Sequence, residues 1–124
     1  MSASHILIAV ALFQLKHYIA DFLLQSRRMV VDKGKYGHPA GLLHVAVHVA
    51  LSLPILLYLG VAGKAIALTM LIEALVHYHI DWGKERLTAL RLLTPSDSAY
   101  WYSLGADQLL HQLTYICIVA VWAV

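Results

Sequence analysis

The 124-residue chain is short of charged residues, which make up only 13% of it. Soluble globular domains carry about 25% charged residues, so the composition argues against a water-soluble domain. Lysine and arginine number 9 against 7 aspartates and glutamates, an excess too small to favour nucleic-acid binding. The single cysteine, Cys117, excludes a disulfide within the chain.

Hydrophobic residues are abundant instead, at 60% of the chain, and the mean hydropathy is +0.70. A membrane-spanning helix needs about 20 mostly apolar residues. Four segments meet this need, at residues 4–25, 40–59, 64–82 and 100–124. The sequence therefore predicts an all-α fold with one domain over residues 1–124. This domain is a polytopic membrane protein whose four transmembrane helices form an up-down bundle.

Basic residues gather in the first and third of the three loops between these segments. They are Arg27, Arg28, Lys33 and Lys35 in the first loop, and Lys84, Arg86 and Arg91 in the third. Because cytoplasmic loops carry the excess of lysine and arginine, we expect both loops to be cytoplasmic and both termini outside. In the third loop, leucines at 87, 90 and 93 predict a short interfacial helix over residues 85–93.

Each hydrophobic segment carries one pair of histidine or aspartate residues spaced four apart. The pairs are His17 with Asp21, His44 with His48, His77 with Asp81, and Asp107 with His111. Residues four apart lie on one helix face. Given the alternating directions of the segments, all four pairs fall within roughly three turns of the cytoplasmic boundary. An up-down bundle would bring these eight side chains to one level in its interior.

Ionisable groups within a membrane are costly and usually face the bundle interior, where they pair or line a cavity. Divalent metal would compensate the carboxylates, and neutral imidazole is a natural ligand beside them. Eight ligands exceed the needs of one tetrahedral ion, so we predict two ions of zinc, manganese or iron. The alternative is a structural cluster in which the same pairs only make hydrogen bonds between helices.

Two further residues are candidates for catalysis. Glu73 lies four residues before His77 and could move a proton, and Lys84 lies near Asp81 and could bind the charge of a substrate. His79 is two residues from both His77 and Asp81, so we place it on another face of the helix and exclude it.

The ordered motifs "HYIADFLLQSRRMVVDKGKYG", "LLHVAVH", "HYHIDWGK" and "DQLLH" cover most of the chain. In them the sequence resembles a family of small bacterial and phage integral membrane proteins that is catalogued only as a domain of unknown function. The resemblance implies a multi-pass protein of the bacterial inner membrane and supplies no activity. A looser similarity, to membrane-bound metal-dependent hydrolases, is one of pattern.

Three classes of function fit these observations. The first is a metal-dependent membrane hydrolase acting on a lipid-linked or phosphorylated substrate, with oxidation at two irons as a variant of the same site. The second is a metal-ion or proton transporter, which the apolar outer halves of the segments disfavour. The third is a non-catalytic membrane partner protein.

Overall fold

The computed structural model describes residues 1–123, and these residues form helices and connections without a strand. The elements in chain order are α1 (Ala3–Tyr18), the π-helix η1 (Ile19–Leu23), α2 (Arg27–Asp32), α3 (Pro39–Tyr58), α4 (Lys64–Leu90) and α5 (Ser98–Trp122). The prediction of an all-α chain is confirmed. The last residue of the predicted fourth segment, 124, lies outside the described residues.

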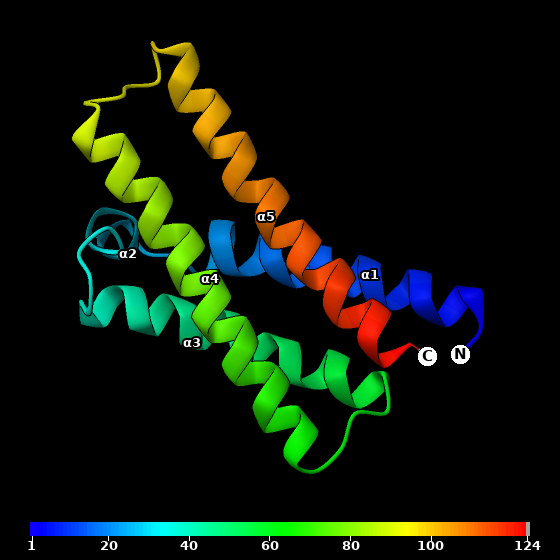
Figure 1. Cartoon of the computed structure of the whole chain (residues 1–124). Helices are drawn as coiled ribbons and strands as arrows, with labels where there is room; N and C mark the ends of the chain where they lie inside the picture. Colours follow the sequence, from blue (N-terminus) through cyan, green and yellow to red (C-terminus); the bar gives the residue numbers. More distant parts are fainter. Residues whose placement is uncertain (124) are drawn as a thin grey trace.

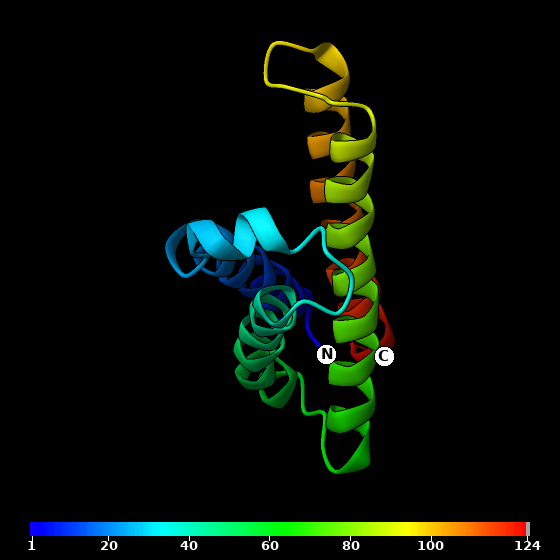
Figure 2. The ribbon, with the colours of Figure 1, turned by 90° about the vertical axis from the view of Figure 1, so that its left-hand side faces the viewer.

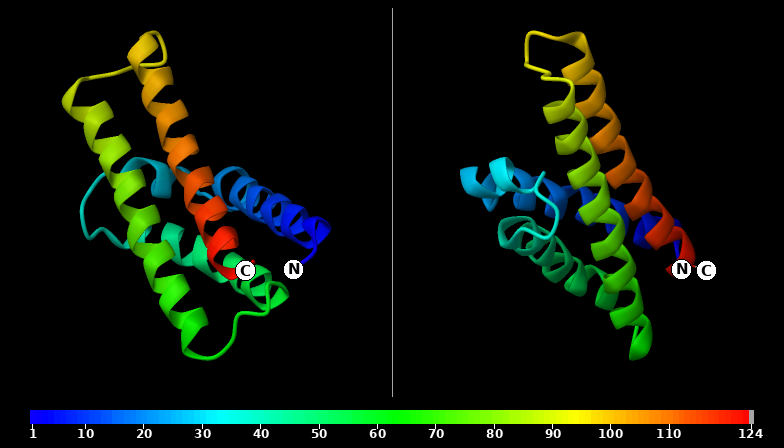
Figure 3. Two further views of the ribbon diagram at one scale, coloured as in Figure 1. Left: turned by 45° about the vertical axis from the view of Figure 1, so that its right-hand side comes forward. Right: turned by 60° about the vertical axis from the view of Figure 1, so that its left-hand side comes forward.

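The four long helices form two pairs that lie in different layers and are inclined to each other (Figures 1 and 2). One layer holds α1 and α3, and the other holds α4 and α5. Between the layers, α3 packs against α4 and α1 packs against α5. The α4–α5 hairpin projects beyond the first layer at the end that carries residues 91–97, whereas the two termini lie close together (Figure 3).

Local sequence signals explain where the helices begin. The hydroxyls of Ser2 and Ser26 accept hydrogen bonds from the backbone N–H of His5 and Met29, which caps α1 and α2. His38 caps α3 in the same way, and Pro39 follows at the first helical position. Such caps satisfy backbone donors that have no partner inside the helix.

The first predicted segment is not one regular α-helix. After Tyr18 the chain widens into η1, in which the N–H of Leu24 bonds the carbonyl of Ile19, five residues back. Single π-turns inside helices occur frequently at functional sites because they shift side chains relative to the regular helix. Asp21 lies in this turn.

The prediction of a separate interfacial helix over residues 85–93 is wrong. α4 continues without a break from Lys64 to Leu90, eight residues past the end of the predicted third segment. Residues 85–90 are mostly good helix formers, and no proline follows Trp82 to stop the helix there. The first loop contains the short helix α2, for which no prediction was made.

The distribution of polarity is that of a membrane protein. The interior contains 12 buried polar or charged residues beside 13 buried hydrophobic ones, whereas leucines such as Leu7, Leu71 and Leu113 are exposed on the outside. Three helical stretches are long and apolar enough to cross a membrane: Ala3–Leu23, Pro39–Tyr58 and Ser98–Trp122. α4 is not among them, because Glu73, His77 and Asp81 interrupt its apolar run. The chain is therefore a membrane protein by composition and by fold.

The hydrophobic interior is concentrated at one end of the helices. We call it the apolar core, and its members are Ala9, Phe13, Ile55, Leu56, Leu59, Val61, Tyr115, Ile118 and Val119. The buried histidines and aspartates lie next to it along the helices.

Candidate metal centre

The structure brings the eight paired residues together, and Asp21 in η1 is one of the two centres of the cluster. Its Oδ1 lies 2.9 Å from Nε2 of His48 and 3.3 Å from Nε2 of His44. Its Oδ2 lies 3.1 Å from Nε2 of His17. Three imidazoles from α1 and α3 therefore point the same ring nitrogen at one carboxylate.

Asp81 in α4 is the second centre. Its Oδ2 lies 3.1 Å from Nε2 of His44 and 3.4 Å from Nε2 of His77. Its Oδ1 lies 3.6 Å from Nε2 of His111 on α5. His44 thus lies between the two carboxylates and contacts both.

The five imidazole rings form one continuous group. Ring centroids are 4.6 Å apart for His44 and His48, 3.9 Å for His48 and His77, and 4.2 Å for His77 and His111. The centroids of His17 and His111 are 5.0 Å apart, which joins α1 to α5. All five side chains are buried. A group of imidazoles this dense cannot be fully protonated, because like charges at such distances repel strongly.

Hydrogen bonds at Nδ1 orient two of the rings. Nδ1 of His111 lies 2.8 Å from the backbone carbonyl of Asp107, and a carbonyl oxygen can only accept. His111 therefore donates from Nδ1 and, when neutral, carries a lone pair on Nε2. Nδ1 of His17 lies 2.9 Å from the hydroxyl of Tyr115. A hydrogen bond of this kind at the far nitrogen is the usual way in which proteins orient a metal-binding histidine.

Unpaired polar atoms are concentrated in this cluster. Among the described residues, nine buried side-chain nitrogen or oxygen atoms lack a hydrogen-bond partner, and only one, Oε2 of Glu73, lies outside the cluster. The other eight belong to His44, His48, His77, Asp81, Asp107 and His111. They include Nε2 of His44, His77 and His111, which lie 3.1–3.6 Å from Asp81 without the geometry of a hydrogen bond. Leaving a buried polar group unpaired costs about 1–3 kcal/mol. Cations at the centre would satisfy several of these atoms at once.

Three overlapping groups have ligand atoms that lie within 4.8 Å of one another: His17, Asp21 and His48; His44, His48 and His77; and His77, Asp81 and His111. The first and third groups share no residue, and each consists of two histidines and one aspartate. We call them the Asp21 triad and the Asp81 triad. The Asp21 triad comes from α1, η1 and α3, and the Asp81 triad comes from α4 and α5.

The two triads repeat one arrangement. In each, a histidine and the aspartate four residues later share one helix or its π-turn, and the following long helix supplies the second histidine. That histidine is in turn the later member of its own pair, His48 in α3 and His111 in α5. The earlier members, His44 and Asp107, are the two residues that do not belong to these two triads.

Asp107 has fewer contacts with the histidines than Asp21 and Asp81 have. Its Oδ2 lies 3.9 Å from Nδ1 of His111 and accepts a hydrogen bond of 3.0 Å from the amide of Gln108. The Gln108 carbonyl oxygen also lies 3.3 Å from Nε2 of His17. Gln108 therefore joins the edge of the cluster on α5 to the Asp21 triad.

Sequence reasoning missed Lys33, which it treated only as a topology signal. The side chain is buried, and its Nζ lies 3.5 Å from Oδ2 of Asp81 and 3.2 Å from Oε1 of Gln25. Two glycines let the neighbouring segments approach closely enough to place Lys33 beside Asp81. A Cβ at Gly34 would lie 2.9 Å from Cβ of Glu85 on α4, and one at Gly41 would lie 3.4 Å from Cα of Lys33. A basic residue in a loop carries no periodic signal that could have identified this contact.

Sequence reasoning also missed Lys16, which is the partner of Glu73. Nζ of Lys16 donates to Oε1 of Glu73 at 2.7 Å and to the carbonyl of His48 at 3.2 Å. The hydroxyl of Ser52 donates to the same Oε1 at 2.7 Å. Lys16, Ser52 and Glu73, which we call the ion-pair layer, are fully or almost fully buried and adjoin both the cluster and the apolar core. Glu73 thus lies beside the cluster and outside the three candidate ligand groups.

The structure also shows where Lys84, His79 and Cys117 lie. Lys84 lies outside the cluster, and its Nζ donates to Oε1 of Glu85 at 2.7 Å. His79 faces away from the cluster, as predicted, with Nδ1 2.7 Å from the carbonyl of Leu75 and Nε2 3.1 Å from the hydroxyl of Tyr36. Cys117 is exposed and free, so the candidate ligands are nitrogen and oxygen atoms only.

Comparisons with known proteins identify the family and no activity. No curated protein and no solved structure matches the chain. The family described as "Protein of unknown function (DUF3307)" matches residues 5–124, nearly the whole length, and the match includes every residue of the cluster. The chain therefore belongs to this family of proteins of unknown function.

Proposed function

We propose that this membrane protein binds two divalent metal ions, one at the Asp21 triad and one at the Asp81 triad. The observation that carries the proposal is the presence of two separate sets of two histidines and one aspartate whose ligand atoms already converge. Metal–ligand bonds of about 2.1 Å place neighbouring ligands roughly 3–3.5 Å apart. The distances from Nε2 to carboxylate oxygen, 2.9–3.6 Å, are close to this spacing.

The donor set narrows the choice of metal. Imidazole and carboxylate without thiolate suit zinc, manganese and iron, and two histidines with one carboxylate leave coordination positions open. His44 contacts both aspartates and is the natural residue to bridge or to complete either site. At the edge of the cluster, Asp107 adds a negative charge beside His111, and Lys33 adds a positive charge beside Asp81.

Hydrolysis is the reaction that this proposal favours, on a lipid-linked or phosphorylated substrate. Divalent ions with open positions lower the pKa of bound water toward neutrality and stabilise a leaving oxygen. Lys84 would hold the charge of the substrate near Asp107. Glu73 would accept or return a proton through its unpaired Oε2. Two irons in the same ligands would instead support oxidation, and the identity of the bound metal separates these reactions.

Transport across the membrane is less well supported. A pathway needs polar groups on both sides of its site, but the cluster adjoins the apolar core at one end. Between the two lies the ion-pair layer, whose charges are already paired. The arrangement favours a centre that is reached from one side.

The proposed location is the bacterial inner membrane, with four spans and both termini outside. The basic residues of the first and third loops support this orientation. Cysteines introduced at positions 27 and 64 test it by labelling with an impermeant reagent. Position 64 should react from outside the cell and position 27 should be protected, and the opposite pattern would reverse the topology.

Metal content is the first experiment for the site. Protein purified without chelator should retain about two divalent ions per chain, measured by elemental analysis, because preformed sites bind metal tightly. Asp81→Asn removes a charged ligand while keeping its shape and should lower the content by at least one ion. His79→Asn is the matched control on the same helix and should retain both ions, since His79 faces away from the cluster.

Each result has a defined meaning. Metal lost only from the Asp81 variant supports the site. Metal absent from all three proteins would contradict it and favour a structural or proton-carrying cluster. Metal equal in all three would show that Asp81 is not a ligand.

A further inference from the structure

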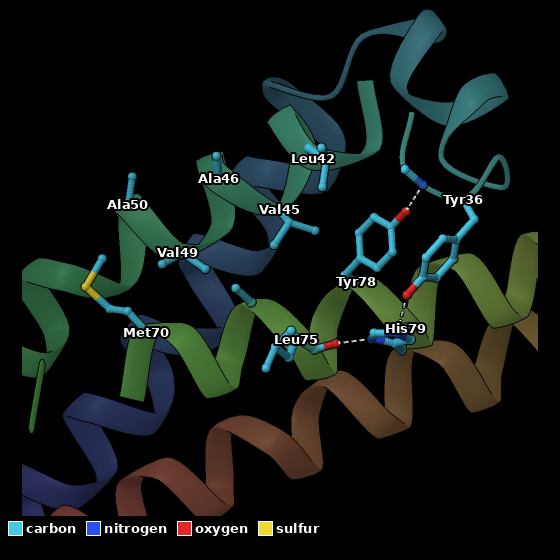
Figure 4. Close-up of a pocket in the computed structure, with 12 residues that line it drawn as sticks. Tyr36, Leu42, Val45, Ala46, Val49, Ala50, Met70, Leu75, Tyr78 and His79 are labelled. Carbon is cyan, nitrogen blue, oxygen red and sulfur yellow. Dashed lines mark hydrogen bonds between the residues drawn. The ribbon is translucent and has the colours of Figure 1, made fainter. Parts of the chain in front are cut away.

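Two grooves flank α4 on the outer surface of the protein. The first lies between α3 and α4, has a volume of about 560 Å³ and is lined mostly by apolar side chains (Figure 4). The second lies between α4 and α5 and consists of two adjoining hollows of about 550 and 740 Å³. Val76, Ile80 and Leu110 line both hollows and join them into one groove. We call the two features the α3–α4 groove and the α4–α5 groove.

The α4–α5 groove changes in character along its length. At one end, which we call the polar end, Lys84, Ser103 and Asp107 line it among side chains that are mostly apolar. Toward the other end it is lined by Leu113, Ile118 and similar side chains, with Trp122 near its limit. A polar end that continues into a long apolar channel matches an amphiphile, with the head group at Lys84 and the hydrocarbon chain between the helices.

The polar groups of the α3–α4 groove are satisfied by one another. The hydroxyl of Tyr78 accepts from the N–H of Gly37 at 2.6 Å, and the hydroxyl of Tyr36 bonds His79, as the dashed lines in Figure 4 show. The α4–α5 groove is lined instead by two charged residues, Lys84, whose Nζ donates to Glu85, and Asp107. The two grooves therefore differ in charge, since no lysine, arginine, aspartate or glutamate among the described residues lines the α3–α4 groove.

Charge indicates which head group this groove would take, an argument that rests on the proposed metal site. Two divalent ions bring four positive charges, against three negative charges on Asp21, Asp81 and Asp107. Lys84 and Glu85 cancel. The polar end of the groove is then positive and attracts an anion, whereas without metal it is negative and repels one.

We propose that the α4–α5 groove binds a lipid with a phosphate head group, holding the phosphate at Lys84 beside Asp107 and one hydrocarbon chain along Val76, Ile80 and Leu110. The chain itself then delivers the head group to the edge of the metal centre from within the membrane. Lys84 acts here as a binding residue, since an ammonium donates to phosphate as a point charge.

Dodecyl phosphate is the probe, and native mass spectrometry of the purified protein in dodecyl maltoside counts the bound molecules. The wild type should retain one dodecyl phosphate per chain. Lys84→Gln should weaken retention about tenfold or more, because a charge-assisted hydrogen bond is lost. Leu110→Trp should weaken it similarly by filling the groove where its two hollows meet. Ala46→Trp is the matched control, since Ala46 lines the α3–α4 groove, and it should bind normally.

Two further arms separate the sources of binding. Inorganic phosphate at the same concentration should be retained much less than dodecyl phosphate, because it lacks the hydrocarbon chain. Treatment with EDTA should abolish retention of dodecyl phosphate by the wild type, because the polar end becomes negative. Equal retention with and without EDTA would overturn the charge argument.

The same spectra report metal, so failure of this inference is distinguishable from failure of the metal site. Two ions per chain with no dodecyl phosphate would overturn the lipid site alone. Absence of metal from the untreated protein would contradict the proposed function and this inference together. Normal binding by both Lys84→Gln and Leu110→Trp, or loss only in Ala46→Trp, would place the lipid elsewhere.

Discussion

The two ends of the helix pairs bury opposite kinds of side chain between the same four helices. At one end the apolar core packs Phe13, Leu56 and their neighbours without a polar atom to satisfy, apart from the hydroxyl of Tyr115. At the other end five histidines and three aspartates share one small volume, and eight of their atoms have no hydrogen-bond partner. Because lipid surrounds both ends, the second arrangement stays costly until something compensates it.

In the ion-pair layer between these two ends, buried charges compensate each other without metal. Lys16 and Glu73 neutralise each other at 2.7 Å, and Ser52 and the carbonyl of His48 take further hydrogen bonds. Nζ of Lys16 also lies 4.3 Å from the centre of the Tyr115 ring, within range of a cation–π contact. The neighbouring cluster instead holds eight buried side-chain atoms without a hydrogen-bond partner. Cations bound as proposed would compensate these atoms, whereas the charges of the layer already compensate each other.

Breaking the ion-pair layer should have the largest effect on stability. Lys16→Met leaves Glu73 charged and unpaired in a fully buried position, and we expect a loss of about 3–5 kcal/mol in the free energy of unfolding. Thermal unfolding in detergent measures it. The double variant Lys16→Met/Glu73→Gln removes both charges and should recover most of the loss. A double variant as unstable as the sum of the two single variants would mean that the pair makes no specific contribution.

Truncating the apolar core should cost less. Phe13→Ala removes a fully buried ring, but in lipid the hydrophobic transfer from water no longer contributes, so mainly the cavity remains. We expect a loss of about 1–3 kcal/mol in the free energy of unfolding, with metal content unchanged. Unfolding and elemental analysis of the same sample test both. Loss of metal from this variant would show that the two ends are not independent.

A smaller effect on stability is expected at Gly34, in the loop that brings Lys33 to the cluster. Gly34→Val places atoms against Glu85 on α4, shifts the loop that carries Lys33 and should cost about 1 kcal/mol. It should also speed the removal of metal by EDTA, since Lys33 covers Asp81. Gly105→Ala in α5 is the control, because no atom lies within 4 Å of its new methyl group. Equal rates of metal loss in both variants would contradict the covering role of Lys33.

The smallest effect concerns an exposed carboxylate, Asp97, outside the membrane-spanning segments. The backbone N–H and the hydroxyl of Thr94 both donate to its Oδ2 and hold the pKa of Asp97 below its usual range. A lowered pKa stabilises the fold above the ordinary aspartate pKa, and this contribution is lost as the pH falls through the lowered value. Melting temperatures between pH 5 and pH 3 should fall slightly more for the wild type than for Asp97→Ala. Parallel pH profiles would show that the Thr94 contacts do not persist in solution.

Much of the fold and of the cluster was predictable from sequence, for a physical reason. Spacing of four on a helix fixes which side chains share a face, and burying ionisable groups in a membrane forces those faces inward. The pairs of Asp21 and Asp81 with their histidines follow from these two rules, and the structure brings them together. Their role as metal ligands stays a prediction.

What sequence could not supply lies where periodicity gives no information. The π-turn at Asp21 breaks the regular spacing, and nothing in the letters of residues 19–23 distinguishes it from an α-helix. The continuation of α4 to Leu90 was missed although residues 85–90 are mostly good helix formers, because the basic residues from Lys84 onward were interpreted as a loop. Sequence analysis gave Lys16 no role, because its partner Glu73 lies 57 positions away.

If the Asp81 triad binds metal as proposed, the position of Lys33 makes uptake an exchange of cations at a single carboxylate. Its ammonium lies 3.5 Å from the same Oδ2 of Asp81 that His44 and His77 approach, so an arriving divalent ion displaces a bound positive charge. The affinity of the proposed site would therefore be the difference in free energy between its metal-bound and its lysine-bound states. Once displaced, the ammonium would keep Gln25 as its partner, whose Oε1 lies 3.2 Å away, and the position of this side chain would report whether the centre is filled.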